Sequence, residues 1–163
     1  MRVGVTGHQE RDGIDWEWTR EAVKKELGTL ASPLEGWSSL AIGADQLFAR
    51  AVLDLGGSIV TVVPGEWYET SFDGDGLERY RALLAAGRRI DLEGLTGEDA
   101  FLAAGLEVAD STDALLAIWD GKCAQGRGGT ADVVDHARKR GKTVMHVNPI
   151  ERTVAALVEI ASQ

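Results

Sequence analysis

Apolar residues along this chain fall into two alternating patterns. Short continuous runs indicate strands, because a strand that is covered on both faces of a sheet is apolar throughout. Runs of this kind lie at residues 2–6, 37–42, 59–63, 88–92, 114–119 and 143–147, and the run at 88–92 carries the weakest signal. The sequence therefore predicts a sheet of six or seven strands.

Between these runs, apolar residues recur with the spacing of a helix. The clearest example begins at Ala44, from which apolar residues follow at i+3, i+4, i+7, i+8 and i+11 until Gly56 and Gly57 end the pattern. We expect helices at residues 15–30, 44–55, 77–86, 96–109 and 130–137, and a last one from about Glu151 onward.

A regular alternation of strands and helices is typical of the α/β class. We expect a Rossmann-like, doubly wound, mainly parallel sheet with helices on both faces, in a single domain that spans residues 1–163. In such sheets, ligands bind at the carboxyl ends of the strands, close to the point where the strand order reverses. Candidate functional residues are therefore expected in the loops that follow the strands.

Composition and charge narrow the range of partners and locations. The net charge of −9 argues against a nucleic-acid partner, because a polynucleotide backbone is also negative. The lone Cys123 excludes an internal disulfide, and no apolar run approaches the ~18 residues that a membrane helix needs. We expect a cytoplasmic protein without membrane association.

The most informative segment spans residues 113–134. Its apolar run stops at Asp120, and Gly128, Gly129 and Thr130 then open a helix. The first N–H groups of a helix have no partner within it and its N-terminus is positive, so this segment predicts a site for the phosphate of a nucleotide or phosphosugar. The alternative is a glycine loop that only connects strand and helix. Arg127, beside the glycines, either binds phosphate or is solvated.

Three other loops are expected to converge on the same edge of the sheet. Their candidate ligand-binding residues are Thr6, Gly7 and His8 after the first strand, Gly43, Ala44 and Asp45 after the second, and Pro64, Glu66 and Trp67 after the third. A glycine after a strand is often a plain turn. The joint occurrence of all four loops is what indicates a site.

Most of the side chains in these loops have two interpretations. His8 either donates to a phosphate or is solvated, and Asp45 either caps its helix or accepts a hydrogen bond from a ribose hydroxyl. Trp67 and Tyr68 either stack on a base or form a lid or a subunit contact. Asp120 either binds a ribose hydroxyl or closes an Asx turn.

The remaining histidines are assigned structural roles. His136 is expected on the outward face of a helix and His146 inside a strand. No metal-ligand spacing joins the histidines to Cys123, so we expect no metal site. No cofactor is required, although a nucleotide-type ligand fits the loops.

Several motifs, taken in order, resemble the SLOG superfamily, a Rossmann-like group named for DNA-processing protein A and the Lonely Guy cytokinin-activating proteins. They are Gly-Val-Thr-Gly-His at 4–8, Leu-Ala-Ile-Gly-Ala-Asp at 40–45, Val-Val-Pro at 62–64, the segment 113–121, and Gly-Gly-Thr-Ala-Asp at 128–132. The resemblance covers nearly the whole chain. It implies binding of a nucleotide or nucleotide-derived ligand, often in a dimer.

The chain departs from the enzymes of this group at the catalytic position. Lonely Guy phosphoribohydrolases carry a catalytic glutamate three residues after the threonine of their glycine motif, where this chain has Val133. The Arg-Lys pair of those enzymes is also absent from residues 65–75. Nucleoside 2-deoxyribosyltransferases show a similar motif order, but their nucleophilic glutamate is likewise missing. The candidates for a catalytic carboxylate are Glu66, Asp120 and Asp132.

These observations favour a protein that binds a nucleotide or a nucleotide-derived, phosphosugar-containing molecule as a sensor or carrier. The alternative is an N-glycosidic hydrolase or transferase acting on nucleotides. Binding of single-stranded DNA and a protein–protein adaptor role rank below both. We expect a homodimer or a higher homo-oligomer.

Overall fold

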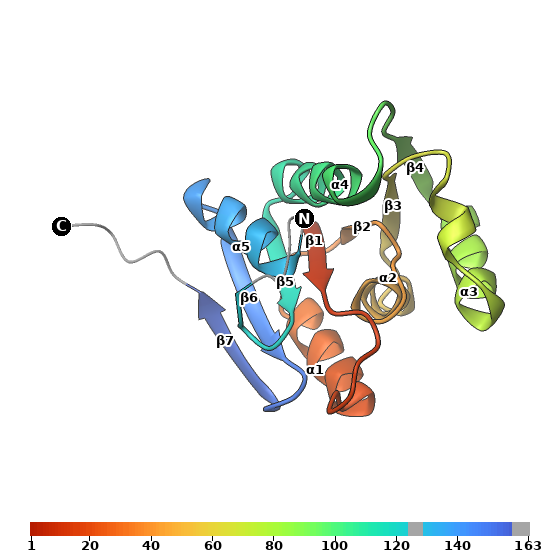
Figure 1. Cartoon of the computed structure of the whole chain (residues 1–163). Coiled ribbons are helices and arrows are strands. Elements are labelled where there is room, and N and C mark those ends of the chain that lie inside the picture. Colours follow the sequence, from red (N-terminus) through yellow and green to blue (C-terminus); the bar gives the residue numbers. More distant parts are fainter. Residues whose placement is uncertain (124–128, 158–163) are drawn as a thin grey trace.

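A computed structural model of the chain describes residues 1–123 and 129–157. Within them, a seven-stranded sheet has the order β4-β3-β2-β1-β5-β6-β7 (Figure 1). Strands β1 to β6 are parallel, and β7 runs antiparallel to β6. The strands are β1 (Arg2–Gly7), β2 (Glu35–Ser38), β3 (Ser58–Val63), β4 (Arg88–Asp91), β5 (Ala114–Ile118), β6 (Thr143–Asn148) and β7 (Thr153–Leu157).

Helices cover both faces of the sheet. They are α1 (Trp16–Gly28), α2 (Ala44–Asp54), α3 (Gly74–Ala85), α4 (Gly97–Ser111) and α5 (Thr130–Lys139), with a 3-10 turn, η1, at Tyr68–Ser71. Figure 1 shows α1 and α2 on one face and α4 and α5 on the other. The predicted α/β, Rossmann-like fold class is confirmed. No helix in the described part of the chain is long and apolar enough to cross a membrane.

Two apolar layers hold the helices to the sheet because alternate residues of a strand point to opposite faces. In β5, Leu116 and Ile118 belong to the layer beneath α1 and α2, whereas Leu115 and Ala117 belong to the layer beneath α4 and α5. All four side chains are at most 2% exposed. This burial on both faces explains why the β5 sequence is apolar throughout.

The strand order reverses between β1 and β5. The chain moves outward from β1 through β2 and β3 to β4, then returns through α4 to place β5 on the other side of β1. The two strands end together, with Gly7 paired in register with Ile118. The His8 N–H then donates to the Ile118 carbonyl at 2.9 Å. A doubly wound sheet binds its ligands at such a point.

The predicted bounds of the second strand were wrong. The strand covers Glu35–Ser38 instead of residues 37–42. Leu40 has a φ of 58°, and its N–H donates to the Ser38 hydroxyl at 2.9 Å, so the backbone turns away from the sheet. Leu40 is nevertheless fully buried, and this burial accounts for an apolar run that continues beyond the strand.

The helix expected from Glu151 onward is contradicted by β7. A turn reverses the chain here: the Asn148 side chain accepts from the N–H groups of Ile150 and Glu151, and Arg152 has a φ of 57°. Strand β7 then pairs with β6 from Thr153 to Leu157. The spacing of alanine, valine and leucine in this segment is compatible with either a helix or a strand. The pairing with β6 makes it a strand.

A glycine is required where β1, β5 and α2 meet. A Cβ atom at Gly7 would lie 2.5 Å from the Ile118 carbonyl oxygen and 2.6 Å from the Ala44 Cβ. We predict that Gly7→Ala lowers the free energy of unfolding by about 1–3 kcal/mol, because neither backbone nor helix is free to move away. Urea unfolding measures the effect. Gly28→Ala, at a helical position with open space around it, is expected to be neutral or slightly stabilising. Equal effects of the two substitutions would contradict the prediction.

Candidate functional site

A cavity of about 310 Å³ opens at the carboxyl end of β1, between α4 and α5 on one side and the start of α2 on the other. Its lining includes five of the ligand-binding residues predicted from the sequence, namely Thr6, Gly7, Asp45, Gly129 and Thr130. Gly128, a sixth candidate, lies outside the described residues, as does Arg127. The other seven do not line this cavity and are His8, Gly43, Ala44, Pro64, Glu66, Trp67 and Asp120.

The N-terminus of α5 faces this cavity. Gly129 is the N-cap residue, with no side-chain cap, and its carbonyl accepts from the N–H groups of Asp132 and Val133. The N–H groups of Thr130 and Ala131 have no acceptor among the described residues. Because the N-terminus of a helix also carries a partial positive charge, this arrangement favours an anion beside Gly129 and Thr130.

Asp45 is the carboxylate that lines the cavity within the described part of the chain. Its side chain accepts from the Ser38 hydroxyl at 3.1 Å and from the Ala41 N–H at 3.4 Å, and Asp45 is 8% exposed. Burial raises the pKa of Asp45 to about 6, although these hydrogen bonds oppose the rise. The sequence treated Asp45 as a ligand-binding residue or a helix cap. It did not identify Asp45 as a catalytic candidate.

Gly43, and not Asp45, is the N-cap of α2, so the predicted capping role of Asp45 was wrong. Gly43 has a φ of 97°, and a Cβ there would lie 2.8 Å from the His8 carbonyl oxygen. That carbonyl also accepts from the N–H of Ala44 at 3.0 Å. Gly43 and Ala44 therefore contact the loop after β1.

Aromatic rings from two elements border the cavity. Tyr68 of η1 and Phe101 of α4 line it, with ring centroids 6.0 Å apart. Trp67 packs edge-on against Phe101 at 5.4 Å and donates from Nε1 to the Leu95 carbonyl. Trp67 therefore has the packing role that was its alternative interpretation. Phe101 was missed because it lies within an apolar helix, where an aromatic residue usually signals packing.

Two other candidates from the third loop do not line the cavity. Pro64 is buried directly after β3, and Glu66 is exposed. Neither side chain borders the space beside α5. Glu66 therefore lies apart from the position that a catalytic carboxylate would occupy in this cavity.

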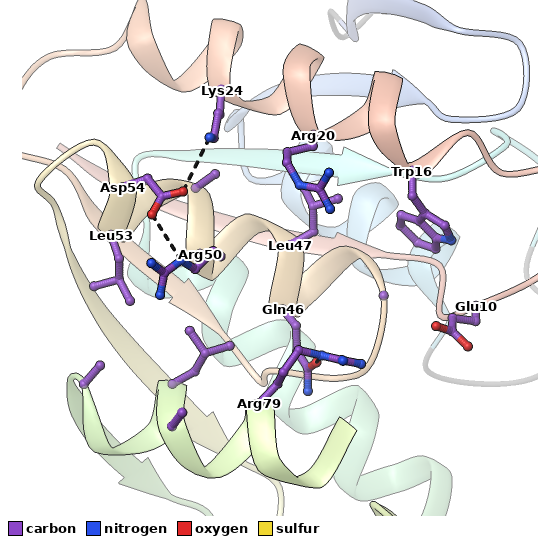
Figure 2. A pocket seen from close by; sticks show the side chains of 15 residues that line it. Glu10, Trp16, Arg20, Lys24, Gln46, Leu47, Arg50, Leu53, Asp54 and Arg79 are labelled. Atoms are coloured by element: carbon purple, nitrogen blue, oxygen red, sulfur yellow. Dashed lines mark hydrogen bonds and ion pairs between the residues drawn. The ribbon is translucent and has the colours of Figure 1, made fainter. Parts of the chain in front are cut away.

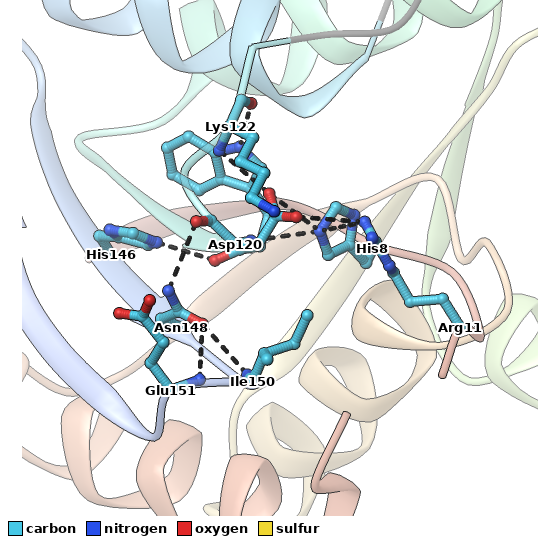
Figure 3. Close-up of polar contacts among 9 residues, drawn as sticks. His8, Arg11, Asp120, Lys122, His146, Asn148, Ile150 and Glu151 are labelled. Atoms are coloured by element: carbon cyan, nitrogen blue, oxygen red, sulfur yellow. Dashed lines mark hydrogen bonds and ion pairs between the residues drawn. The ribbon is translucent and has the colours of Figure 1, made fainter. Parts of the chain in front are cut away.

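His8 and Asp120 hold the ends of β1 and β5 together (Figure 3). The His8 Nε2 atom accepts from the Asp120 N–H at 3.1 Å and lies 3.1 Å from an Arg11 nitrogen. Burial lowers the pKa of His8, and the negative charge of Asp120 opposes this effect only in part. Two donors at Nε2 require a neutral ring that carries its proton on Nδ1. The His8 Nε2 atom is thus an acceptor within the loop, while Nδ1 carries the ring's one N–H donor.

The Asp120 carboxylate is engaged by the protein itself. It accepts from the Lys122 N–H at 3.0 Å, which is the predicted Asx turn, and it pairs with Arg11 at 3.3 Å. Burial acts to raise the pKa of Asp120, but the Lys122 N–H and the nearby charges of Arg11 and Lys122 hold it below the usual value. Asp120 is an ion-pair partner within the loop.

The other histidines have the structural contacts expected of them. His146 lies over the Trp119 ring at 4.4 Å, and its Nε2 is 2.8 Å from the Trp119 carbonyl oxygen. His136 pairs with Asp110 at 2.8 Å. Within residues 1–123 and 129–157, no three His, Cys, Asp or Glu residues are grouped as metal ligands.

Val133 stands three residues after Thr130, where the Lonely Guy phosphoribohydrolases that the motifs resemble carry a glutamate, and it lines the cavity. The side chain is 2% exposed and packs against α4, where a Cβ on Gly105 would lie 2.6 Å from its Cγ2. Asp132, the neighbouring catalytic candidate, is half-buried and does not line the cavity. An apolar wall therefore replaces a carboxylate at this position.

The raised pKa of Asp45 makes stability depend on pH. A carboxyl with a higher pKa in the folded state keeps its proton there, so stability falls as the pH rises from about 4 through about 6. We predict that Asp45→Asn, which keeps an acceptor oxygen, raises the free energy of unfolding at pH 7.5 by up to about 3 kcal/mol. The gain should fall to about half at pH 5.0. Urea unfolding at the two pH values tests this, and a gain independent of pH would contradict it.

Comparisons with known proteins identify solved structures with a similar fold. No family model and no curated protein matches the chain. Among solved structures it is similar to DNA processing protein A from Streptococcus pneumoniae, with a TM-score of 0.67 and 17% identity over 90% of this chain. This chain spans 50% of that protein.

Two further structures agree with this comparison. DNA processing protein A from Helicobacter pylori, whose single-stranded DNA binding mode has been described, gives a TM-score of 0.63 at 15% identity, over 91% of this chain and 65% of the other. A third structure, TM1055, gives 0.52 at 19% identity, over 88% and 71%. The chain thus has the Rossmann-like fold of DNA processing protein A, one of the proteins for which the SLOG superfamily is named, and the resemblance seen in the sequence is supported by the fold.

Proposed function

We propose that the cavity between β1, α4 and α5 binds one nucleotide or nucleotide-derived molecule, with its phosphate at the N-terminus of α5. The observation that carries this proposal is the N-terminus of α5, where Gly129 and Thr130 line a cavity of about 310 Å³ and the Thr130 N–H has no acceptor among the described residues. Small-molecule sites usually occupy about 300–1,000 Å³, so a ligand near the small end of that range fits.

The lining offers a partner for each part of such a ligand. The Thr130 hydroxyl and the helix N-terminus suit a phosphate, and Asp45 can accept from a sugar hydroxyl. Phe101 and Tyr68 supply an aromatic wall for a base. With Val133 in the position of the family glutamate, this arrangement favours a sensor or carrier.

The chemistry of the cavity favours a single nucleotide over a strand of DNA. DNA processing protein A from Helicobacter pylori binds single-stranded DNA. Here neither lysine nor arginine lines the cavity within the described residues, and the chain carries a net charge of −9. A polynucleotide would need several cations along its backbone. A cytoplasmic location and a homo-oligomeric state stay part of the proposal.

A charge placed at the start of α5 tests the binding mode. We predict that Thr130→Glu weakens nucleoside monophosphate binding at least tenfold, because the carboxylate repels phosphate and competes for the helix N-terminus. The same carboxylate favours the helix, so thermal stability should be kept. Calorimetry with a panel of nucleoside monophosphates, cyclic nucleotides and ADP-ribose measures affinity.

Thr96→Glu is the matched control. Thr96 is an exposed N-cap residue, at the start of α4, that does not line the cavity, so its substitution should leave affinity unchanged. If no member of the panel binds the folded wild-type protein below the millimolar range, the proposal fails. Equal loss in both variants would also count against it.

A second candidate function rests on Asp45. A buried carboxyl with a pKa of about 6 can act as a general acid. It would protonate the leaving base while the N-glycosidic bond breaks and water adds to the sugar. We predict that any release of base from nucleoside monophosphates declines above pH 6, where Asp45 loses its proton, and is abolished in Asp45→Asn.

Chromatography of the free base measures this activity. Glu66→Gln is the control, because Glu66 is exposed and does not line the cavity. Activity that survives in Asp45→Asn but not in Glu66→Gln would assign the chemistry elsewhere. If the wild-type protein binds nucleotides but releases no base, the hydrolase function is excluded and the binding function is retained.

A further inference from the structure

A second and larger concavity lies on the opposite side of the sheet from α4 and α5. This groove, of about 520 Å³, is bounded by α1 and α3, and α2 forms its floor (Figure 2). Its lining extends along α2 from Gly43 to Asp54, which at 1.5 Å per residue is about 16 Å. The groove therefore has the length of about three helical turns.

The floor of the groove is apolar. Leu47 and Ala51 of α2 lie one turn apart, and Leu83 of α3 joins them from the side. The Gln46 amide in the same floor is already bonded: its nitrogen donates to the carbonyls of Leu40 and Gly76, and its oxygen accepts from Arg79. No buried polar group of the described lining is thus left to orient a small molecule.

The rim of the groove is cationic. Figure 2 shows Arg20 and Lys24 projecting from α1, Arg50 from α2 and Arg79 from α3. Lys24 and Arg50 both pair with Asp54, at 3.4 Å and 3.1 Å, so that cluster keeps one positive charge.

Two more cations add to this charge. Arg20 and Arg79 pair with no carboxylate among the described residues, and Glu10 is the other acidic residue of the lining. An acidic chain thus carries a positive band along one groove, and a band of this kind attracts a negatively charged partner.

We propose that this groove is a docking site for an acidic amphipathic helix of a partner protein. A helix laid between α1 and α3 would pack apolar residues at i, i+3, i+4 and i+7 onto the half-buried Leu47 and Leu53, above the buried Ala51 and Leu83. Its flanking glutamates and aspartates would face Arg20 on one wall and Arg79 on the other. An apolar floor with charges only at the rim suits a helix better than a small anion, which needs directed polar contacts.

Two synthetic peptides test the proposal with the full chain. One is a 14-residue helix with leucine at i, i+3, i+4, i+7 and i+11 and glutamate elsewhere, and the other has lysine in place of glutamate. Fluorescence anisotropy of the labelled peptides gives the affinities. The glutamate peptide is expected to bind saturably, and the lysine peptide at least tenfold more weakly.

Charge reversal at the rim locates the binding. Arg20→Glu combined with Arg50→Glu should weaken binding of the glutamate peptide at least tenfold, because both side chains border the groove. Lys25→Glu combined with Lys139→Glu is the charge-matched control, since both lysines are exposed and lie outside the groove, and Lys25 is on the same helix as Arg20. It should change the affinity less than twofold. Circular dichroism checks that all variants are folded.

Three results would overturn the proposal. They are absence of saturable binding of the glutamate peptide, equal binding of both peptides, and equal weakening by the Lys25 and Lys139 control. Calorimetry with nucleoside monophosphates adds a further check. If the Arg20 and Arg50 double variant loses nucleotide binding while Thr130→Glu keeps it, the groove holds a small anion, and the cavity beside α5 does not.

Discussion

The close approach of β1, β5 and α2 around Gly7 determines where everything else in this molecule lies. A Cβ there would meet the Ile118 carbonyl and the Ala44 Cβ, so glycine allows the three elements to approach this closely at the point where the strand order reverses. The reversal puts the end of β1 beside the end of β5 and directs α2 and α5 to opposite faces of the sheet. The cavity beside α5 is a product of this arrangement.

Around that point, polar groups lock the loops in place. His8 and Asp120 bind each other and Arg11, and the Gly43 backbone packs on the loop after β1. These residues looked like ligand contacts in the sequence, yet the folded protein uses them to position its own backbone. The residues left to meet a ligand are those whose hydrogen bonds the fold does not use. At the start of α5, the Thr130 N–H has no acceptor among the described residues, and Thr130 lines the cavity.

The features that could be predicted from the sequence are those set by interactions between residues close together in the chain. The α/β class followed from local patterns, because alternating apolar runs and helical spacing record burial directly. The end of β2 and the β7 strand did not, since Leu40 is buried outside any strand and β7 is defined by its pairing with β6. In the candidate site, Thr130 was found from its glycine motif. Phe101 and the buried state of Asp45 depend on contacts between distant segments, and no local pattern reveals them.

The burial of Asp45 in the cavity that the N-terminus of α5 also lines has one more consequence. An arriving phosphate would place negative charge near a carboxyl whose pKa is about 6, and the neutral form of that carboxyl would then be favoured. Ligand capture would be accompanied by proton uptake from the solvent. A mildly acidified solution would strengthen binding down to about pH 6, so that the molecule would respond to acidity as well as to ligand concentration.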